Sequence, residues 1–149
     1  MILRLGPIAD FGLWISIWKG LIKMGVDILI VDDEVEFAEA FAERLRLRGF
    51  TAHIANSGEQ ALGIVDQGAV KVMVLDLKMP GMDGLEVLRR VKKSHPEVEV
   101  IILSGHGSEM DDAYGRNLGA FAYLRKPADI GDILEAVKRA EKLLASRAV

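Results

Sequence analysis

The stretch Val70-Lys71-Val72-Met73-Val74-Leu75-Asp76 decides the fold that this chain is expected to adopt. Its mainly apolar, β-branched character predicts a buried strand over residues 70–75, and strands buried on both faces belong to parallel sheets covered by helices. An acid follows directly, and Met79-Pro80-Gly81 then prevents the strand from continuing. Asp76 is therefore expected at the edge where open α/β sheets place their functional groups.

A second apolar run, Ile28–Val31, ends in the acid pair Asp32 and Asp33. Parallel strands of one sheet bring their C-terminal ends to the same edge, so these acids and Asp76 are expected to converge. Three carboxylates repel one another unless a cation or a proton joins them. The arrangement predicts a divalent-metal site built around one aspartate that can act as a nucleophile.

Strand-like and helix-like patterns alternate five times from Val26 onward, which predicts an α/β fold with a doubly wound, mostly parallel sheet and helices on both faces. The expected strands are Ile28–Val31, Thr51–Ala55, Val70–Leu75, Val98–Leu103 and Phe121–Leu124. Helical spacing follows each strand, and Ser57 with Gln60 forms a capping-box pattern. The weakest helix is that at 111–118, because Gly115 costs about 1 kcal/mol relative to alanine.

Composition limits the classes of protein that this chain can be. With 149 residues, of which 50% are hydrophobic, the chain is long enough for one domain with a substantial core. The net charge of −3 does not indicate nucleic-acid binding. The basic residues near the C-terminus alternate with acids, which predicts a solvated helix face. The absence of cysteine excludes disulfides and thiolate chemistry and is compatible with a cytoplasmic protein.

Residues 1–25 form an apolar N-terminal extension whose role the sequence leaves open. Both tryptophans of the chain, Trp14 and Trp18, lie in this extension. Its apolar run is too short to span a bilayer, and it lacks the cleavage site of a signal peptide. Three alternatives stay open: a packing or dimerisation helix, contact of residues 1–24 with a membrane surface, and an upstream extension before a natural start at Met24.

Four features align in chain order at the expected strand ends: Asp32-Asp33, Asp76, Ser104 and Lys126-Pro127. With these residues the chain resembles the receiver domain of two-component response regulators. The stretches that carry the resemblance are Ile28–Glu34, Asp76–Gly84, Ile101–Gly107 and Tyr123–Pro127. The resemblance covers about residues 26–146 and implies a flavodoxin-like sheet of order 2-1-3-4-5, with residues 26–149 as the receiver domain.

The resemblance also implies a role for each of these residues. Asp76 would accept a phosphoryl group from a phosphohistidine. Asp33, Asp76 and the backbone carbonyl of Lys78 would hold Mg²⁺, and Asp32 would help directly or through water. Lys126 and Ser104 would each contact a phosphate oxygen. Such oxygen ligands suit Mg²⁺, which keeps several of its waters. The Lys126–Pro127 peptide is usually cis in this family, and residues at positions 78 and 106 tune the lifetime of the phosphate.

Phosphorylation adds a charge of about −1.5 to −2, and this new charge would operate a switch. Ser104 would move toward the phosphate, Tyr123 would turn inward into the vacated space, and the surface over residues 111–146 would change shape. The partners implied are a sensor histidine kinase or a phosphotransfer protein, and a downstream protein or a further C-terminal domain. A homodimer stays open, whereas no nucleic-acid contact by this domain is expected.

The same residues allow other interpretations. Asp32 and Asp33 can serve as an N-cap of the next helix, and Ser104, Tyr123 and Lys126 can be ordinary strand-end residues. Haloacid-dehalogenase-type phosphatases also use an aspartate nucleophile with Mg²⁺, but they need a second acid where this chain has Lys78. A pseudo-receiver that only binds partners would lack the acceptor, the acid pair or the lysine. The joint occurrence of these residues favours a phosphoacceptor signalling module.

Overall fold

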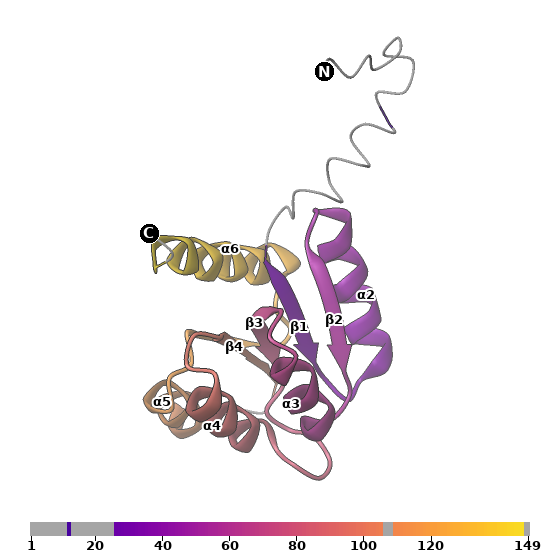
Figure 1. Ribbon diagram of the computed structural model, residues 1–149. Helices are drawn as coiled ribbons and strands as arrows, with labels where there is room; N and C mark the ends of the chain where they lie inside the picture. Colours follow the sequence, from indigo (N-terminus) through magenta and orange to yellow (C-terminus); the bar gives the residue numbers. More distant parts are fainter. Residues whose placement is uncertain (1–11, 13–25, 106–108, 148–149) are drawn as a thin grey trace.

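Five parallel strands form the central sheet, in the order β2-β1-β3-β4-β5 (Figure 1). The computed structural model describes residue 12, residues 26–105 and residues 109–147. The N-terminal extension other than residue 12, and His106, lie outside the described residues. The strands are β1 (Asp27–Val31), β2 (Thr51–Ala55), β3 (Val70–Leu75), β4 (Glu99–Ser104) and β5 (Ala122–Arg125). The predicted α/β class, the flavodoxin-like strand order and the parallel pairing are confirmed.

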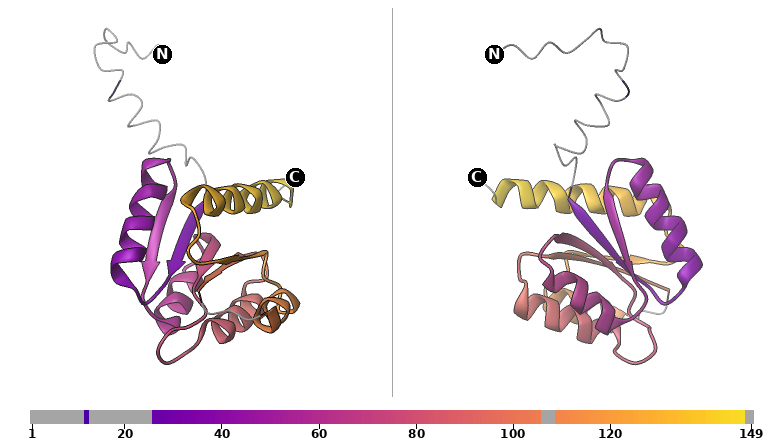
Figure 2. Two further views of the ribbon diagram at one scale, coloured as in Figure 1. Left: turned by 180° about the vertical axis from the view of Figure 1, so that it is seen from behind. Right: turned by 45° about the vertical axis from the view of Figure 1, so that its right-hand side comes forward.

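Helices connect successive strands and cover both faces of the sheet, as two further views show (Figure 2). They are α2 (Val35–Leu47), α3 (Gly58–Asp66), α4 (Gly84–Ser94), α5 (Glu109–Asn117) and α6 (Ile130–Arg147). The capping box at Ser57 is present: its Oγ accepts the Gln60 N–H at 3.2 Å. The Gln60 side chain accepts the N–H of Asn56 at 2.8 Å, so the reciprocal bond lies one residue before the cap.

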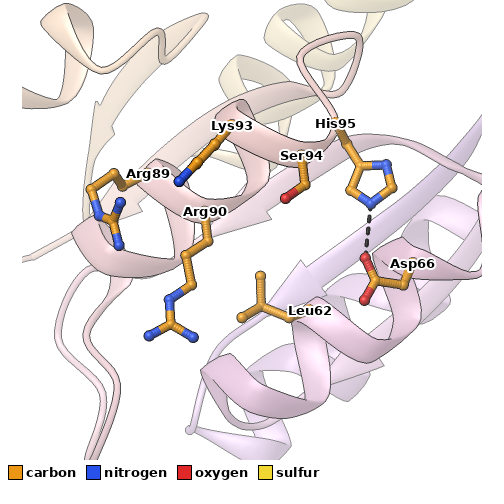
Figure 3. Close-up of a pocket in the computed structure, with 7 residues that line it drawn as sticks. All are labelled: Leu62, Asp66, Arg89, Arg90, Lys93, Ser94 and His95. Carbon is orange, nitrogen blue, oxygen red and sulfur yellow. Dashed lines mark hydrogen bonds and ion pairs between the residues drawn. The ribbon is translucent and has the colours of Figure 1, made fainter.

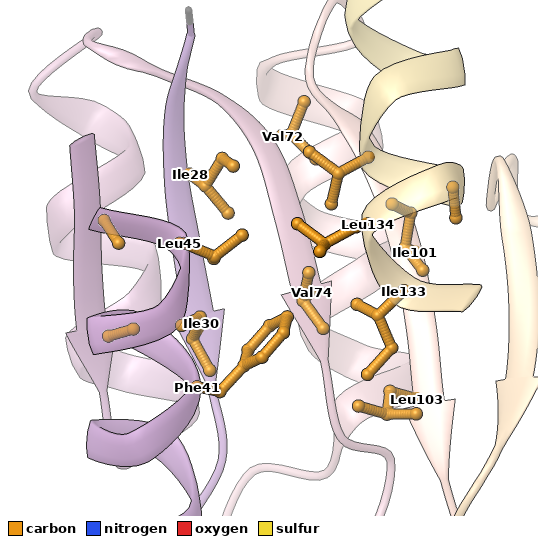
Figure 4. Packing of buried hydrophobic residues seen from close by; sticks show 14 of the residues in the cluster. Ile28, Ile30, Phe41, Leu45, Val72, Val74, Ile101, Leu103, Ile133 and Leu134 are labelled. Carbon is orange, nitrogen blue, oxygen red and sulfur yellow. The ribbon is translucent and has the colours of Figure 1, made fainter. Parts of the chain in front are cut away.

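Alternating strand residues divide the core between the two faces of the sheet, because successive side chains of a strand point in opposite directions. On one face, Ile28 and Ile30 of β1 pack with Phe41 of α2 and Ile133 of α6 (Figure 4). On the other face, the core is formed with α3 and α4 by residues such as Leu29, Val31, Ala61, Leu75 and Leu88. Both faces of β1, β3 and β4 are buried, which explains their nearly uninterrupted apolar sequences.

The boundaries around β4 and β5 differ slightly from those expected. Both strands begin and end one residue later than predicted, so Ser104 is the last residue of β4 rather than the first of a loop. The weakly predicted helix is present as α5, and Gly115 has a packing role. The position of a Cβ on Gly115 would lie 2.7 Å from Ile102 Cδ1, so the glycine lets α5 approach β4 closely.

The basic residues near the C-terminus lie on the exposed side of α6, as expected for a solvated helix face. Across the described parts of the chain, none of the helices has the length and apolar character needed to cross a membrane.

Candidate functional site

The two acidic segments meet because β1 and β3 are neighbours in the sheet. The N–H of Asp32 bonds to the carbonyl of Ala55 in β2 at 3.1 Å, and the N–H of Asp76 bonds to the carbonyl of Val31 in β1 at 2.9 Å. Backbone hydrogen bonds thus hold both acids in register at the C-terminal edge of the sheet. This edge is the point where the strand order reverses and where doubly wound proteins bind their ligands.

Asp32, Asp33 and Asp76 bring one carboxylate oxygen each to within 4.8 Å of one another. Asp32 and Asp76 are 2% and 7% exposed, whereas Asp33 is half-buried. Oxygens on opposite sides of a six-coordinate Mg²⁺ are about 4 Å apart, so small side-chain rotations would make the three acids fit one ion. Like charges at this spacing repel one another unless a cation or a proton joins them, and the donor set is the all-oxygen type that Mg²⁺ prefers.

Lys126 reaches the acidic cluster from the segment that follows β5. Its Nζ lies 2.7 Å from Asp32 Oδ2 and 3.9 Å from Asp76 Oδ2. The Lys126–Pro127 peptide is cis, as the resemblance implied, and the Lys126 N–H bonds to the carbonyl of Ser104 at 3.1 Å. Burial acts to lower the pKa of Lys126, but the hydrogen bond to Asp32 and the nearby carboxylates outweigh it, so the pKa is raised and the ammonium stays charged.

Asp76 is held between opposing electrostatic influences. Burial raises the pKa of its carboxyl above the ordinary value of 3.8, and the charges of Asp32 and Asp33 act in the same direction. Lys126 and a backbone hydrogen bond from Lys78 act the other way and only partly offset this rise in pKa. A bound cation would lower the pKa and so favour the charged form, which is the form that can act as a nucleophile.

The loop after Asp76 is held against the start of α4 by a glycine. The N–H of Gly84 bonds to the carbonyl of Leu77 at 2.7 Å. A Cβ on Gly84 would collide with the carbonyl oxygen of Asp76 and lie 2.5 Å from Leu77 Cα. Asp83 caps α4 by accepting the N–H of Glu86 at 2.9 Å. The glycine and the cap together fix the backbone that carries Asp76 and the exposed Lys78.

Ser104 and Tyr123 lie on the neighbouring strands β4 and β5. Ser104 is fully buried at the end of β4 and pairs in register with Arg125. Tyr123 pairs with Ile102, is half-buried, and packs against the core on the α3–α4 face. Both side chains therefore belong to the part of the sheet that supports Lys126. Ile102, the in-register neighbour of Tyr123, lies against Gly115 of α5.

Comparison with known proteins identifies the family. The profile of the response regulator receiver domain matches residues 28–138. The chain belongs to this family. The uncharacterized transcriptional regulatory protein YkoG of Bacillus subtilis is 34% identical over 113 residues, which cover 76% of this chain and 50% of YkoG. Sensor kinase CckA of Brucella abortus is 38% identical over 116 residues, covering 74% of this chain and 12% of CckA.

Solved structures agree with this assignment of the receiver domain. A CheY-like response regulator receiver domain protein from Methanospirillum hungatei superposes with a TM-score of 0.80 at 27% identity, covering 83% of this chain and 99% of that one. This chain spans about half the length of the curated relative YkoG. The receiver domain is a signalling module. The haloacid-dehalogenase-type phosphatases, which are the enzyme alternative, form a different family.

Two residues of the receiver domain's site were not anticipated. The ring of Phe37 on α2 lies under Lys126, with Nζ 4.5 Å from the ring centroid, which is a cation–π contact. Asn56 donates from Nδ2 to the carbonyl of Asp32 at 3.0 Å and so ties the acid pair to the end of β2. Neither residue carries a local sequence signal, because each contact joins segments far apart in the chain.

The interpretation of Asp32 and Asp33 as the helix N-cap is wrong. The N-cap of α2 is Glu34, whose side chain makes no capping bond. Asp32 Oδ1 instead accepts the N–H of Glu34 at 2.9 Å, while Oδ2 accepts from Lys126. Its carboxylate thus orders the loop and holds the lysine at the same time.

A separate hollow of about 290 Å³ lies between α3 and the C-terminal end of α4 (Figure 3). Its basic lining is largely neutralised within the chain: His95 pairs with Asp66 at 2.8 Å, and Glu86 pairs with both Arg89 and Arg90. Its lining on α4 begins at Arg89, roughly 8 Å along the helix from Gly84, and includes none of the acids of the cluster at Asp76. It is therefore distinct from the acidic site.

Proposed function

We propose that this receiver domain accepts a phosphoryl group on Asp76 and thereby switches a protein-binding surface. The observation that carries the proposal is the convergence of three carboxylates and the Lys126 ammonium at one edge of the sheet. A carboxylate nucleophile beside a fixed cation is suited to phosphoryl transfer, in which positioning and charge neutralisation supply most of the catalysis.

In the proposed step, an oxygen of Asp76 attacks the phosphorus of a phosphohistidine in line with the bond to the imidazole nitrogen. The new O–P bond forms an acyl phosphate as the N–P bond breaks, and the bonding electrons return to the imidazole. Lys126, 3.9 Å from Asp76 Oδ2, neutralises one phosphate oxygen, and the hydroxyl of Ser104 donates to another. The domain turns over no separate substrate; it promotes only its own phosphorylation and a slow loss of the phosphate.

Mg²⁺ is the proposed cofactor. Asp33 and Asp76, with Asp32 directly or through water and the backbone carbonyl of Lys78, are the residues that would hold it. When bound, the ion spreads the charge of the transferring phosphoryl group and offsets the repulsion among the carboxylates. The close spacing and burial of the acids support this assignment.

Ser104 and Tyr123 are the proposed switch residues. A phosphate on Asp76 would draw the Ser104 hydroxyl toward it and open space into which the Tyr123 ring can turn. Because Tyr123 lies on β5 beside α5, its rotation would reshape the surface over residues 111–146. Of the two residues proposed to tune the lifetime of the phosphate, Lys78 is exposed beside the acidic cluster, and His106 lies outside the described residues.

The proposed phosphoryl donors are a sensor histidine kinase or a histidine phosphotransfer protein. The proposed docking surface for such a donor lies where α2 meets the start of α6. A groove of about 200 Å³ there is lined by apolar residues including Phe37, Ala128 and Ile130. Val35, on the first turn of α2, is 53% exposed. Apolar residues exposed around a charged site are typical of protein-binding surfaces.

The output of the switch is proposed to be a protein partner, either a separate target or a further domain of a longer protein. Relatives include a transcriptional regulatory protein and a sensor kinase, so similar domains occur in proteins of different kinds. We propose a cytoplasmic location, with which the absence of cysteine is compatible. No contact of this domain with nucleic acid is proposed, since the net charge of the chain is −3.

Incubation with acetyl phosphate and Mg²⁺, followed by intact mass measurement, tests the chemistry without a protein donor. We expect one added phosphoryl group in the wild type and none in Asp76→Asn. The matched control is Asp66→Asn, at the far end of the domain, which should be labelled like the wild type. Labelling of Asp76→Asn at the wild-type level would overturn the assignment of the acceptor.

Val35→Glu tests the proposed docking surface of the donor. It should slow transfer from a phosphorylated kinase but leave labelling by acetyl phosphate unchanged.

A further inference from the structure

The end of the sheet opposite Asp76 carries a surface groove of about 610 Å³. It lies between the beginnings of β1 and β3 and the last two turns of α6. Its apolar lining consists of Val26, Leu144 and Ala145. Val26 and Leu144 also pack against the core, so at this groove the core continues to the surface. Apolar surface of this kind is stabilised by being covered.

We propose that this groove is the docking site for the apolar N-terminal extension of the same chain, through residues Trp18–Gly25. The inference is independent of the function proposed for Asp76, because the groove lies at the opposite end of the strands. Of the three alternatives left open by the sequence, it selects the packing segment.

Connectivity is the first argument for this occupant. Val26 lines the groove, and its N–H donates to Glu141 Oε2 at 3.3 Å, so the preceding residues leave from the groove itself. Eight residues from Trp18 to Gly25 span roughly 12 Å as a helix and up to about 28 Å when extended. The last two turns of α6, from Glu141 to Arg147, are about 10 Å long. The segment can therefore cover the groove.

Composition is the second argument. Trp18, Leu21 and Ile22 are apolar and lie within reach of the groove, and each tryptophan carries on the order of 200 Å² of surface that water solvates poorly. Lys19 and Lys23 alternate with these residues. The charged residues that line the groove, Glu97, Glu141, Lys71 and Arg147, balance one another. The apolar contacts therefore carry the complementarity between the segment and the groove.

Tethering is the third argument, and it favours the same chain over a second copy. A short linker holds a segment near its site at an effective concentration in the millimolar range. A groove on another molecule at micromolar protein concentration competes poorly with this. The occupant expected in dilute solution is therefore the chain's own segment.

Tryptophan fluorescence of the full chain carrying Trp14→Phe tests the proposal, because Trp18 of the docking segment is then its single tryptophan. We expect emission at shorter wavelength than in the denatured chain, weak quenching by acrylamide, and no change on dilution. Ala145→Glu should place a charge in the groove and increase quenching severalfold. Ala145 is exposed, so the substitution removes no core packing. The matched control is Ser146→Glu, which adds the same charge to an exposed neighbour outside the groove.

Several results would overturn the proposal. Equal quenching with and without Ala145→Glu would show that the groove does not shield Trp18. Shielding that disappears on dilution would assign the groove to a second copy, and shielding that requires phosphatidylglycerol vesicles would assign the segment to a membrane. Far-UV circular dichroism and labelling by acetyl phosphate should be unchanged in both variants, which separates this test from that of Asp76.

Discussion

The Nζ of Lys126 lies 2.7 Å from Oδ2 of Asp32, closer than to any oxygen of the proposed acceptor. In the unphosphorylated domain the lysine is thus held by Asp32, with the Phe37 ring beneath it. A phosphate on Asp76 would introduce a second, more highly charged partner within reach of the same ammonium. The ion pair that orders the resting site therefore also keeps the lysine ready for the transferred group.

Lys126→Ala should slow labelling by acetyl phosphate by about 100-fold, the typical effect of removing one group that stabilises developing charge. The measurement is the time course of intact mass at fixed Mg²⁺. The matched control is Lys93→Ala, which removes an exposed lysine at the C-terminal end of α4. This variant should be labelled at the wild-type rate. Equal rates for the two variants would contradict the role given to Lys126.

Asp76→Asn should stabilise the Mg²⁺-free domain at neutral pH. Burial raises the pKa of Asp76 in the folded state above its ordinary value of 3.8. At pH values between the ordinary and the raised pKa, the folded protein therefore holds a proton that the unfolded chain has lost. The contribution of Asp76 to the free energy of unfolding therefore falls as pH rises through this window. Above the window, the charged and buried carboxylate destabilises the folded state. Urea unfolding in EDTA at several pH values measures the difference, which should vanish below the window.

Mg²⁺ should reverse this order of stability. A ligand at 100 times its dissociation constant adds about 2.7 kcal/mol to the free energy of unfolding if it binds only the folded state. The wild type should show such a gain, and Asp76→Asn should lose most of it. Asp66→Asn should respond to Mg²⁺ like the wild type. An equal gain in Asp76→Asn would place the ion elsewhere.

Gly84→Ala should destabilise the domain, by about 1–3 kcal/mol, because its Cβ would meet the backbone of Asp76 and Leu77, which cannot move aside as a side-chain tip can. Gly63→Ala on the exposed side of α3 meets nothing within 4 Å and should stabilise the domain by up to about 1 kcal/mol. Urea unfolding of both variants checks the contrast. A neutral effect at Gly84 would mean that the loop after Asp76 tolerates displacement.

Tyr123→Ala should leave labelling of Asp76 intact but uncouple it from α5. In the wild type, phosphorylation should change amide hydrogen exchange over α5 and β5, since the strand that carries Tyr123 is in contact with α5. The change should be lost in Tyr123→Ala. Tyr114→Ala removes a ring that is 52% exposed on α5 itself and is the matched control. A wild-type response in Tyr123→Ala would contradict the switch.

The fold and the main site residues could be predicted because their signals are local or repeat along the chain. Apolar runs that end in acids specify buried strands and place Asp32, Asp33 and Asp76 at one edge once the sheet is parallel. The boundaries of β4 and β5 were displaced by one residue, because strand ends are set by pairing with the neighbouring strand rather than by residue type.

The sequence by itself determined the alternation of strands and helices, the acid pair and the single acid, and the lysine before a proline. The tertiary structure alone decided which oxygen Lys126 touches, that Phe37 lies beneath it, and that Gly84 and Gly115 are needed for close packing. The physical reason is the sequence separation between the residues that interact. Strand and helix preferences depend on residues a few positions apart, whereas contacts between side chains and the clearance at a glycine depend on segments brought together only by folding.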